Sequence, residues 1–290
     1  LLDGNPESLA ISALVAAGVY IGLAVFCIRG RVGGLVHLGE AFIANGVVFA
    51  TLAVPLALDA RWTAATWALE GAGVIWIGVR QNRMVPRMMG IALQLLAGLA
   101  LASDLTGDLQ LPAFANSEFL GAVVIVAGGL FAAIYLRIHT DRIHRLESWA
   151  ATALAAWAFA WLFGAGLFDS SVRADDDYRF GVWLIYFCAS VFVLHWLADR
   201  FDFEALRTPA YALVPVLFLT SMAMAVELDH PFASLGWLGW FVAIVVHIAT
   251  LRRFEERSGR WLELIHGAPI VLVSALGAWT FAHFVGDAFT

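Results

Sequence analysis

The sequence predicts an all-α fold, a polytopic transmembrane helix bundle of about ten helices, and three observations predict it. Of the 290 residues, 61% are hydrophobic and only 14% are charged, with a mean hydropathy of +0.82, whereas soluble domains carry about 25% charged residues. Ten apolar segments approach the roughly 20 residues that a helix needs to cross a bilayer. Arginines gather in every second connection between these segments. We therefore expect a single transmembrane domain over residues 1–290, a piece of a longer polytopic protein.

The ten expected helices follow one another with short connections. They cover residues 9–28, 35–58, 63–79, 86–103, 119–137, 148–168, 180–198, 208–227, 235–251 and 262–286. Unpaired backbone groups are costly in lipid, so each segment is expected to be helical. Three residues recur when the chain is shifted by 170 positions, since Leu58, Asp59 and Trp67 fall on Leu228, Asp229 and Trp237. This echo indicates either a parallel internal repeat, as in some transporters, or chance similarity between apolar segments.

The arginines predict how the chain is oriented in the membrane. Basic residues in short loops are retained on the cytoplasmic side, and all 17 basic residues of this chain are arginines. Fourteen of them follow the first, third, fifth, seventh and ninth segments, and only Arg61, Arg173 and Arg179 lie on the other side. We expect a multi-pass protein of a bacterial inner membrane, with both ends of this piece outside, in the periplasm.

Composition and motifs exclude several functional classes. The net charge of −6 offers no basic face for nucleic acid, so the expected partners are the lipid bilayer and other membrane proteins. Cys27 and Cys188 lie singly in apolar segments without CxxC spacing, and no three-ligand metal spacing, P-loop, nucleophile elbow or Rossmann pattern occurs. We expect no metal and no cofactor, and whether the chain is an enzyme stays open.

Polar residues inside the expected helices are the intramembrane candidates. Trp62, Thr66, Glu70 and Gly73 recur at spacings of four, four and three, so they share one helix face. A charged acid near mid-membrane costs roughly 2.5–3.5 kcal/mol, so Glu70 should face protein or water. It is either a protonatable group in a substrate or proton pathway or a hydrogen-bonded residue that holds helices together among small neighbours.

Five further residues complete the candidate set. Glu40, near the inner end of the second segment, would continue the polar seam of Glu70, or it is an interfacial acid with hydrogen-bonded neighbours. Gln94 in the fourth segment is expected to make a packing hydrogen bond. At the outer face, Asp59 and Arg61 either pair across a tight turn or clamp a ligand. Asn116 is the remaining outer-face candidate.

The stretch around these residues resembles a known family. The residues that carry the resemblance are 55–62 (PLALDARW), 67–71 (WALEG), 76–81 (WIGVRQ), 90–97 (GIALQLLA) and 116–121 (NSEFLG). Over roughly residues 40 to 165 the chain resembles the bacterial predicted-membrane-protein family known only as domain of unknown function 2339. The resemblance implies membrane placement and a fragment of a longer protein, and it brings no activity, substrate or catalytic residue.

Three functions stay open on the sequence alone. A transport-like or envelope-assembly component would use the seam of Glu40 and Glu70. A membrane enzyme acting on a lipid-linked substrate would use Asp59, Arg61, Trp62 and the acidic stretch 169–179, and it predicts a groove open sideways to lipid at the outer leaflet. A non-catalytic scaffold for other membrane proteins predicts no cavity at Glu70.

Overall fold

The computed structural model describes residues 6–29, 60–106, 112–255 and 262–289, together with positions 38–39, 41–43, 45–46, 49–50 and 53. Every element in these residues is a helix. The long helices are α1 (Pro6–Arg29), α3 (Ala60–Arg80), α4 (Met84–Ser103), α5 (Ser117–Ile138), α6 (Ala150–Arg173), α7 (Arg179–Phe201), α9 (Leu213–Glu227), α10 (Gly236–Glu255) and α11 (Leu262–Phe289). The short ones are η1 (Thr140–Arg142), η2 (Arg145–Glu147), η3 (Glu204–Arg207) and α8 (Thr208–Tyr211).

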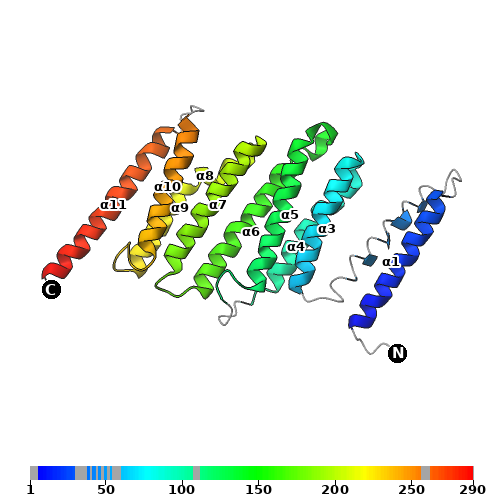
Figure 1. The fold of residues 1–290 in the computed structure, drawn as a ribbon, viewed down its shortest axis with the longest axis horizontal. Coiled ribbons are helices and arrows are strands. Elements are labelled where there is room, and N and C mark those ends of the chain that lie inside the picture. Colours follow the sequence, from blue (N-terminus) through cyan, green and yellow to red (C-terminus); the bar gives the residue numbers. More distant parts are fainter. Residues whose placement is uncertain are drawn as a thin grey trace.

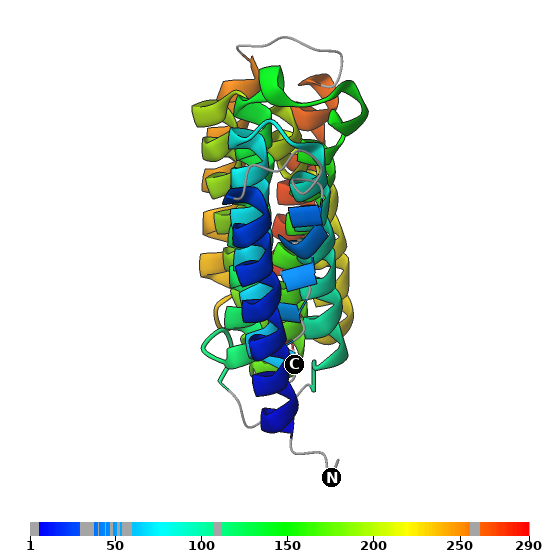
Figure 2. The same cartoon turned by 90° about the vertical axis from the view of Figure 1, so that its right-hand side faces the viewer.

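These helices confirm the all-α class and match nine of the ten expected segments. The second segment, residues 35–58, lies mostly outside the described residues, so the parallel internal repeat that would include it stays a prediction. The helices stand side by side in a broad row with α1 at one edge and α11 at the other (Figure 1), and the view along that row shows its narrow side (Figure 2). Connections after α3, α5 and α7 lie at the upper ends of the helices, and those after α4, α6 and α9 lie at their lower ends (Figure 1). The upper ends are called the arginine-rich end of the row.

Six of the described helical segments are long and apolar enough to cross a membrane. They are Ile11–Ile28, Met84–Ser103, Ser117–Ile138, Ala150–Arg173, Arg179–Phe201 and Glu204–Glu227. The apolar stretches of α10 and α11 are shorter, Gly236–Arg252 and Pro269–Val285. Helix α3 is not among the six, because Thr63, Thr66 and Glu70 lower the hydropathy of its sequence. The spans expected beyond these six stay a prediction from the length of the segments and the alternation of the arginines.

Two expected segments differ in detail. The sixth was expected to end at residue 168, but α6 continues to Arg173 because an ion pair one turn apart neutralises the charges of its last turn. The eighth is divided into α8 and α9, which meet at Ala212. Pro215 is the reason, because a proline ring clashes with the carbonyl four residues earlier, here that of Tyr211, and has no N–H to donate to it.

Helices α3, α4 and α5 approach one another through glycines. A Cβ atom on Gly90 would lie 2.5 Å from the Gly71 carbonyl oxygen, and one on Gly128 would lie 2.9 Å from the Ala68 carbonyl oxygen. Only glycine permits such backbone contact, and small residues at helix crossings are the usual means of close packing within membranes. Ala68 and Gly71 are thus among the small residues at which these helices approach most closely.

Buried apolar side chains divide between the two halves of the row. One cluster joins α7, α9, α10 and α11 around Leu184, Leu213 and Trp240. A second cluster joins α3 to α6 around Ile75 and Leu154, toward the arginine-rich end, and also includes Ala198 of α7 and Leu206 of η3. A third lies around Ala68 and Ile125, toward the other end. Helices α6 and α7 contact each other across the boundary, so the site described next lies in the α3–α6 half.

Candidate functional site

Several sequence candidates cannot be placed. Glu40 and Asp59 lie outside the described residues, and Arg61 and Trp62 lie in the first turn of α3 with side chains that are likewise outside the description. The polar seam between Glu40 and Glu70, and the pairing of Asp59 with Arg61, therefore stay predictions.

The structure places the remaining intramembrane candidates on two sides of α3. Gln94 is fully buried, and its Nε2 donates to the Ala68 carbonyl oxygen over 2.7 Å, which is the packing hydrogen bond expected of it. Thr66 and Glu70 are half-buried and each makes a polar contact within the protein. Residues two positions apart point to different sides of a helix, so the contact at Ala68 does not bring Gln94 to the side that carries Glu70.

The outer-face candidate Asn116 lies at the start of α5 and belongs to a buried polar cluster. It is the N-cap of that helix, and its Oδ1 accepts from the Phe119 N–H over 2.8 Å. Its Nδ2 donates to Asp169 Oδ1 over 2.8 Å and to the Pro112 carbonyl over 3.1 Å. One amide thus caps α5 and ties it to the end of α6.

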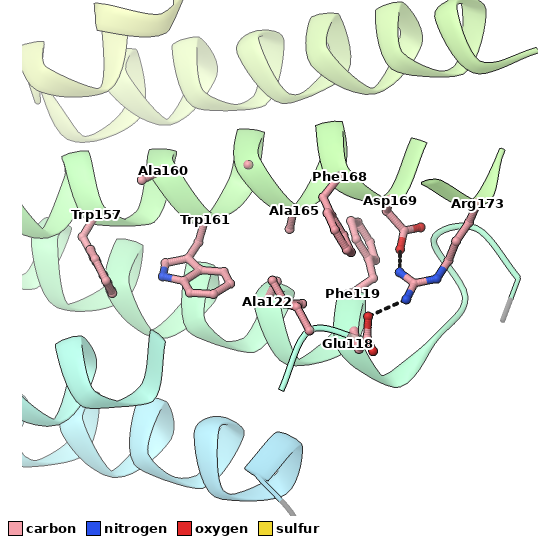
Figure 3. Close-up of a pocket in the computed structure, with 12 residues that line it drawn as sticks. Glu118, Phe119, Ala122, Trp157, Ala160, Trp161, Ala165, Phe168, Asp169 and Arg173 are labelled. Atoms are coloured by element: carbon pink, nitrogen blue, oxygen red, sulfur yellow. Dashed lines mark hydrogen bonds and ion pairs between the residues drawn. The ribbon is translucent and has the colours of Figure 1, made fainter. Parts of the chain in front are cut away.

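Two carboxylates and one guanidinium form the centre of this cluster, which we call the ion triad: Glu118, Asp169 and Arg173. Arg173 donates from Nη1 to Asp169 Oδ1 over 2.6 Å and from Nη2 to Glu118 Oε2. The side chains are 0%, 1% and 2% exposed for Arg173, Glu118 and Asp169. Figure 3 shows the guanidinium between the two carboxylates. Each ion is therefore paired, as buried charges require.

The remaining carboxylate oxygens of the ion triad are used by the connection between α4 and α5. Glu118 Oε1 accepts from the Thr106 hydroxyl over 2.6 Å and from the Thr106 N–H over 3.2 Å. Asp169 Oδ2 accepts the N–H of Phe114, a residue held in the left-handed region with φ 59°. The ion triad is consequently a closed network that joins α5, α6 and this connection.

A cavity of about 410 Å³ runs along α6 from the ion triad to Trp157. Its wall on α6 contains Trp157, Trp161, Gly164 and Phe168, which recur at spacings of four, three and four and so share one face. Figure 3 shows the aromatic side chains along this face and the ion triad at one end. The remaining lining residues are Leu105, Phe119, Ala122, Ala160 and Ala165. Apart from the ion triad and the indole N–H groups, the cavity offers a ligand only hydrocarbon.

Glycine and tryptophan shape the cavity. Trp157 and Trp161 approach Gly98 of α4 so closely that a Cβ there would lie 2.2 Å from Trp157 Cζ2. The Trp157 Nε1 atom is buried and has no hydrogen-bond acceptor among the described residues. Gly164, in contrast, is exposed and a Cβ on it would meet nothing within 4 Å. The cavity is therefore closed toward α4 by indoles and open beside Gly164.

The sequence predicts Asn116 as a candidate but not the other residues that define this site. In the sequence, Glu118 stands out only within the family resemblance, Asp169 only as part of an outer acidic stretch, and Arg173 only as part of that stretch and as one of three outer arginines. Two signals were present in the sequence: Asn116 followed by Glu118 has the pattern of a capped helix start, and Asp169 with Arg173 has the i, i+4 spacing of a helical ion pair. The cavity itself gives no such signal.

Comparison with known proteins identifies one family for this chain. The model of a family described as a predicted membrane protein (DUF2339) matches residues 1–290, which extends the resemblance beyond residues 40–165. No curated protein and no solved structure matches the chain.

Proposed function

The chain belongs to the family of predicted membrane proteins DUF2339, and from that premise we propose that it binds the hydrocarbon chain of a lipid-like molecule in the cavity along α6. In this proposal the protein is a multi-pass inner-membrane component of a transport-like or envelope-assembly process. The observation that carries the proposal is an apolar cavity of about 410 Å³ that ends at a closed ion network. Ligand cavities commonly have volumes of about 300–1,000 Å³.

The dimensions of the cavity fit an acyl chain of one leaflet. Its wall on α6 runs from Trp157 to Phe168, a separation of eleven residues that spans about 16 Å at 1.5 Å per residue. Half of a bilayer's hydrocarbon core is about 15 Å thick. With the ion triad at headgroup depth, the cavity would hold one chain of a lipid in the outer leaflet.

The chemistry of the ion triad favours binding over catalysis. Both terminal nitrogens of Arg173 are bonded to carboxylates and the side chain is buried, so the guanidinium would have to lose a partner to hold a phosphate. Each carboxylate oxygen of Glu118 and Asp169 already accepts a hydrogen bond, which leaves no base prepared to take a proton. The outer-face enzyme therefore receives less support from this site than lipid binding does.

Glu70 does not line the cavity, so the proposal does not depend on a proton pathway through that residue.

The orientation in the membrane is part of the proposal. The ion triad lies at the start of α5 and the end of α6, which is the opposite side of the row from the connections after α3, α5 and α7 (Figure 1). Arginines in those connections favour the cytoplasm, which would place the cavity toward the periplasm. Reporter fusions at Thr106 and Thr140 test this, because they should report opposite sides of the membrane.

Photo-cross-linking tests lipid binding directly. Purified protein in vesicles that contain a phospholipid with a diazirine in one acyl chain should become labelled on α6 between Trp157 and Phe168. Gly164→Phe fills the open side of the cavity without a clash at Cβ and should remove most of this labelling. Gly277→Phe is the matched control, because Gly277 of α11 also has nothing within 4 Å of an added Cβ.

Labelling of α6 should persist in the Gly277→Phe protein. Equal labelling of wild type and the Gly164→Phe variant along Trp157–Phe168 would refute the proposal, because the label would then come from bulk lipid on an exposed face.

A further inference from the structure

A second cavity lies at the arginine-rich end of the row and has a different character. Its volume is about 560 Å³, and it lies between the end of α5, the short helices η1 and η2, the start of α6 and η3. Its wall contains two arginines and three hydroxyl side chains, all exposed: Arg137, Arg145, Thr140, Ser148 and Thr152. We call this cavity the arginine cleft.

The acids that line the arginine cleft do not cancel its positive charge. Glu147 is buried, and its carboxylate accepts hydrogen bonds from Arg87 Nε over 2.6 Å and from Arg87 Nη2 over 2.9 Å. Glu204 pairs with Arg207, whose guanidinium also bonds Asp199 over 3.0 Å. Both acids are thus paired with arginines that lie outside the cleft wall, Glu147 with Arg87 alone and Glu204 with an arginine that it shares with Asp199. One negative charge is left over at Arg207, against the two positive charges of the cleft arginines.

The two arginines of the cleft keep their charge available. Arg137 donates to the Asp202 carbonyl oxygen over 3.3 Å, an uncharged acceptor. In the part of the chain that the structure describes, neither Arg137 nor Arg145 pairs with a carboxylate. The guanidinium is the side chain best suited to bidentate contact with phosphate oxygens, and hydroxyls at the same wall can donate further hydrogen bonds.

Helix dipoles do not decide the sign of the potential here. The cleft borders both the C-terminus of α5 and the N-terminus of α6, whose partial charges of about −0.5 and +0.5 offset each other. The two positive charges of Arg137 and Arg145 therefore decide it, since they exceed the one negative charge left over where Glu204 and Asp199 share Arg207. Basic pockets between transmembrane helices on the cytoplasmic side are typical binding places for anionic lipid headgroups.

We propose that the arginine cleft binds a phosphoryl group through Arg137 and Arg145, presented either by the headgroup of an anionic phospholipid or by a soluble phosphate ester. This inference is independent of the cavity along α6, because the two sites lie at opposite ends of the bundle and share no lining residue.

Native mass spectrometry of the detergent-solubilised protein tests the lipid source. Phosphatidylglycerol should bind in preference to phosphatidylcholine. Each of Arg137→Ala and Arg145→Ala should weaken that binding about fivefold, and the double variant about twenty-fivefold, if each arginine acts independently. Arg142→Ala is the matched control, because Arg142 carries the same charge on the adjacent turn but does not line the cleft. Its binding should equal that of wild type.

Calorimetry with glycerol phosphate and with inorganic phosphate tests the soluble source on the same variants. Binding of phosphatidylglycerol alone identifies a headgroup site, and binding of the soluble esters alone identifies a soluble ligand; loss in the double variant is required in either case. Raising salt from about 0.1 M to about 1 M shortens the Debye length from about 10 Å to about 3 Å and should weaken binding by wild type. Arg145→Lys keeps the charge and should restore part of the affinity.

Equal binding by wild type, the double variant and Arg142→Ala would overturn the inference, as would failure of every phosphoryl probe to bind. Circular dichroism and gel filtration of the variants give the folding control, and the exposed positions of both arginines predict unchanged results.

Discussion

Removing the positive charge of the ion triad should destabilise the protein strongly. Arg173→Ala would leave Glu118 and Asp169 as two buried carboxylates, with side chains 1% and 2% exposed, and no cation between them. Removing one partner of a buried ion pair costs about 3–5 kcal/mol, and the mutual repulsion of the two acids adds to that cost. We therefore expect a loss at the upper end of that range in the free energy of unfolding.

Two further variants provide the comparison for this loss in the free energy of unfolding. Glu118→Gln removes one of two acids and leaves the Arg173–Asp169 pair, while the new amide oxygen can still accept from Thr106, so a loss of about 1–2 kcal/mol is expected. Arg179→Ala is the control for a surface charge, because Arg179 is 28% exposed and pairs with two exposed acids, Asp176 and Glu227. Pairs of this kind are worth about 0–1 kcal/mol each.

Reversible unfolding in mixed micelles, followed by tryptophan fluorescence, measures all three. The expected order of destabilisation is Arg173→Ala, then Glu118→Gln, then Arg179→Ala. Equal losses for Arg173→Ala and Arg179→Ala would refute the account of the ion triad as a buried, obligatory network.

Three other substitutions follow from the packing. Gly90→Leu should cost about 1–3 kcal/mol or prevent folding, because its Cβ would lie 2.5 Å from a backbone oxygen. Gly73→Leu is the control and should leave the stability unchanged, because a Cβ on Gly73 meets no atom within 4 Å. Thermal unfolding in detergent compares the two variants. Asn116→Ala should cost about 2 kcal/mol through loss of the α5 cap and of the bond to Asp169, measured in the same micelles. Arg87→Met should cost about 3–5 kcal/mol by leaving Glu147 buried and unpaired, and the double variant with Glu147→Leu should recover most of that loss in the same unfolding assay.

The fold followed from the sequence because membrane helices are long, apolar and regularly spaced. Length and apolarity located nine of the helices, and the arginine pattern agrees with the alternation of their ends in Figure 1. The end of α6 was set too early because Asp169 and Arg173 resemble loop charges until their pairing is known. In the same way, Arg87 was counted as an inner loop charge, although it is 2% exposed and pairs with Glu147, 60 positions further along the chain.

The site was harder to predict than the helices. Asn116 was identified as a candidate, but its partner Asp169 is 53 positions away, and one sequence carries no record of such pairs. The cavity is lined by Gly164, Ala165 and the two indoles of α6, residue types that occur throughout an apolar chain. Only packing decides that Trp157 and Trp161 lean toward Gly98 and leave Gly164 open.

A cryo-electron microscopy structure in lipid nanodiscs tests most directly the proposal that a lipid chain occupies the cavity along α6. The account predicts elongated density between Trp157 and Phe168, running from the level of the ion triad toward the membrane interior, and its disappearance in the Gly164→Phe protein. A cavity filled by the protein's own side chains, with lipid density only on the outer surface of the row, would contradict it.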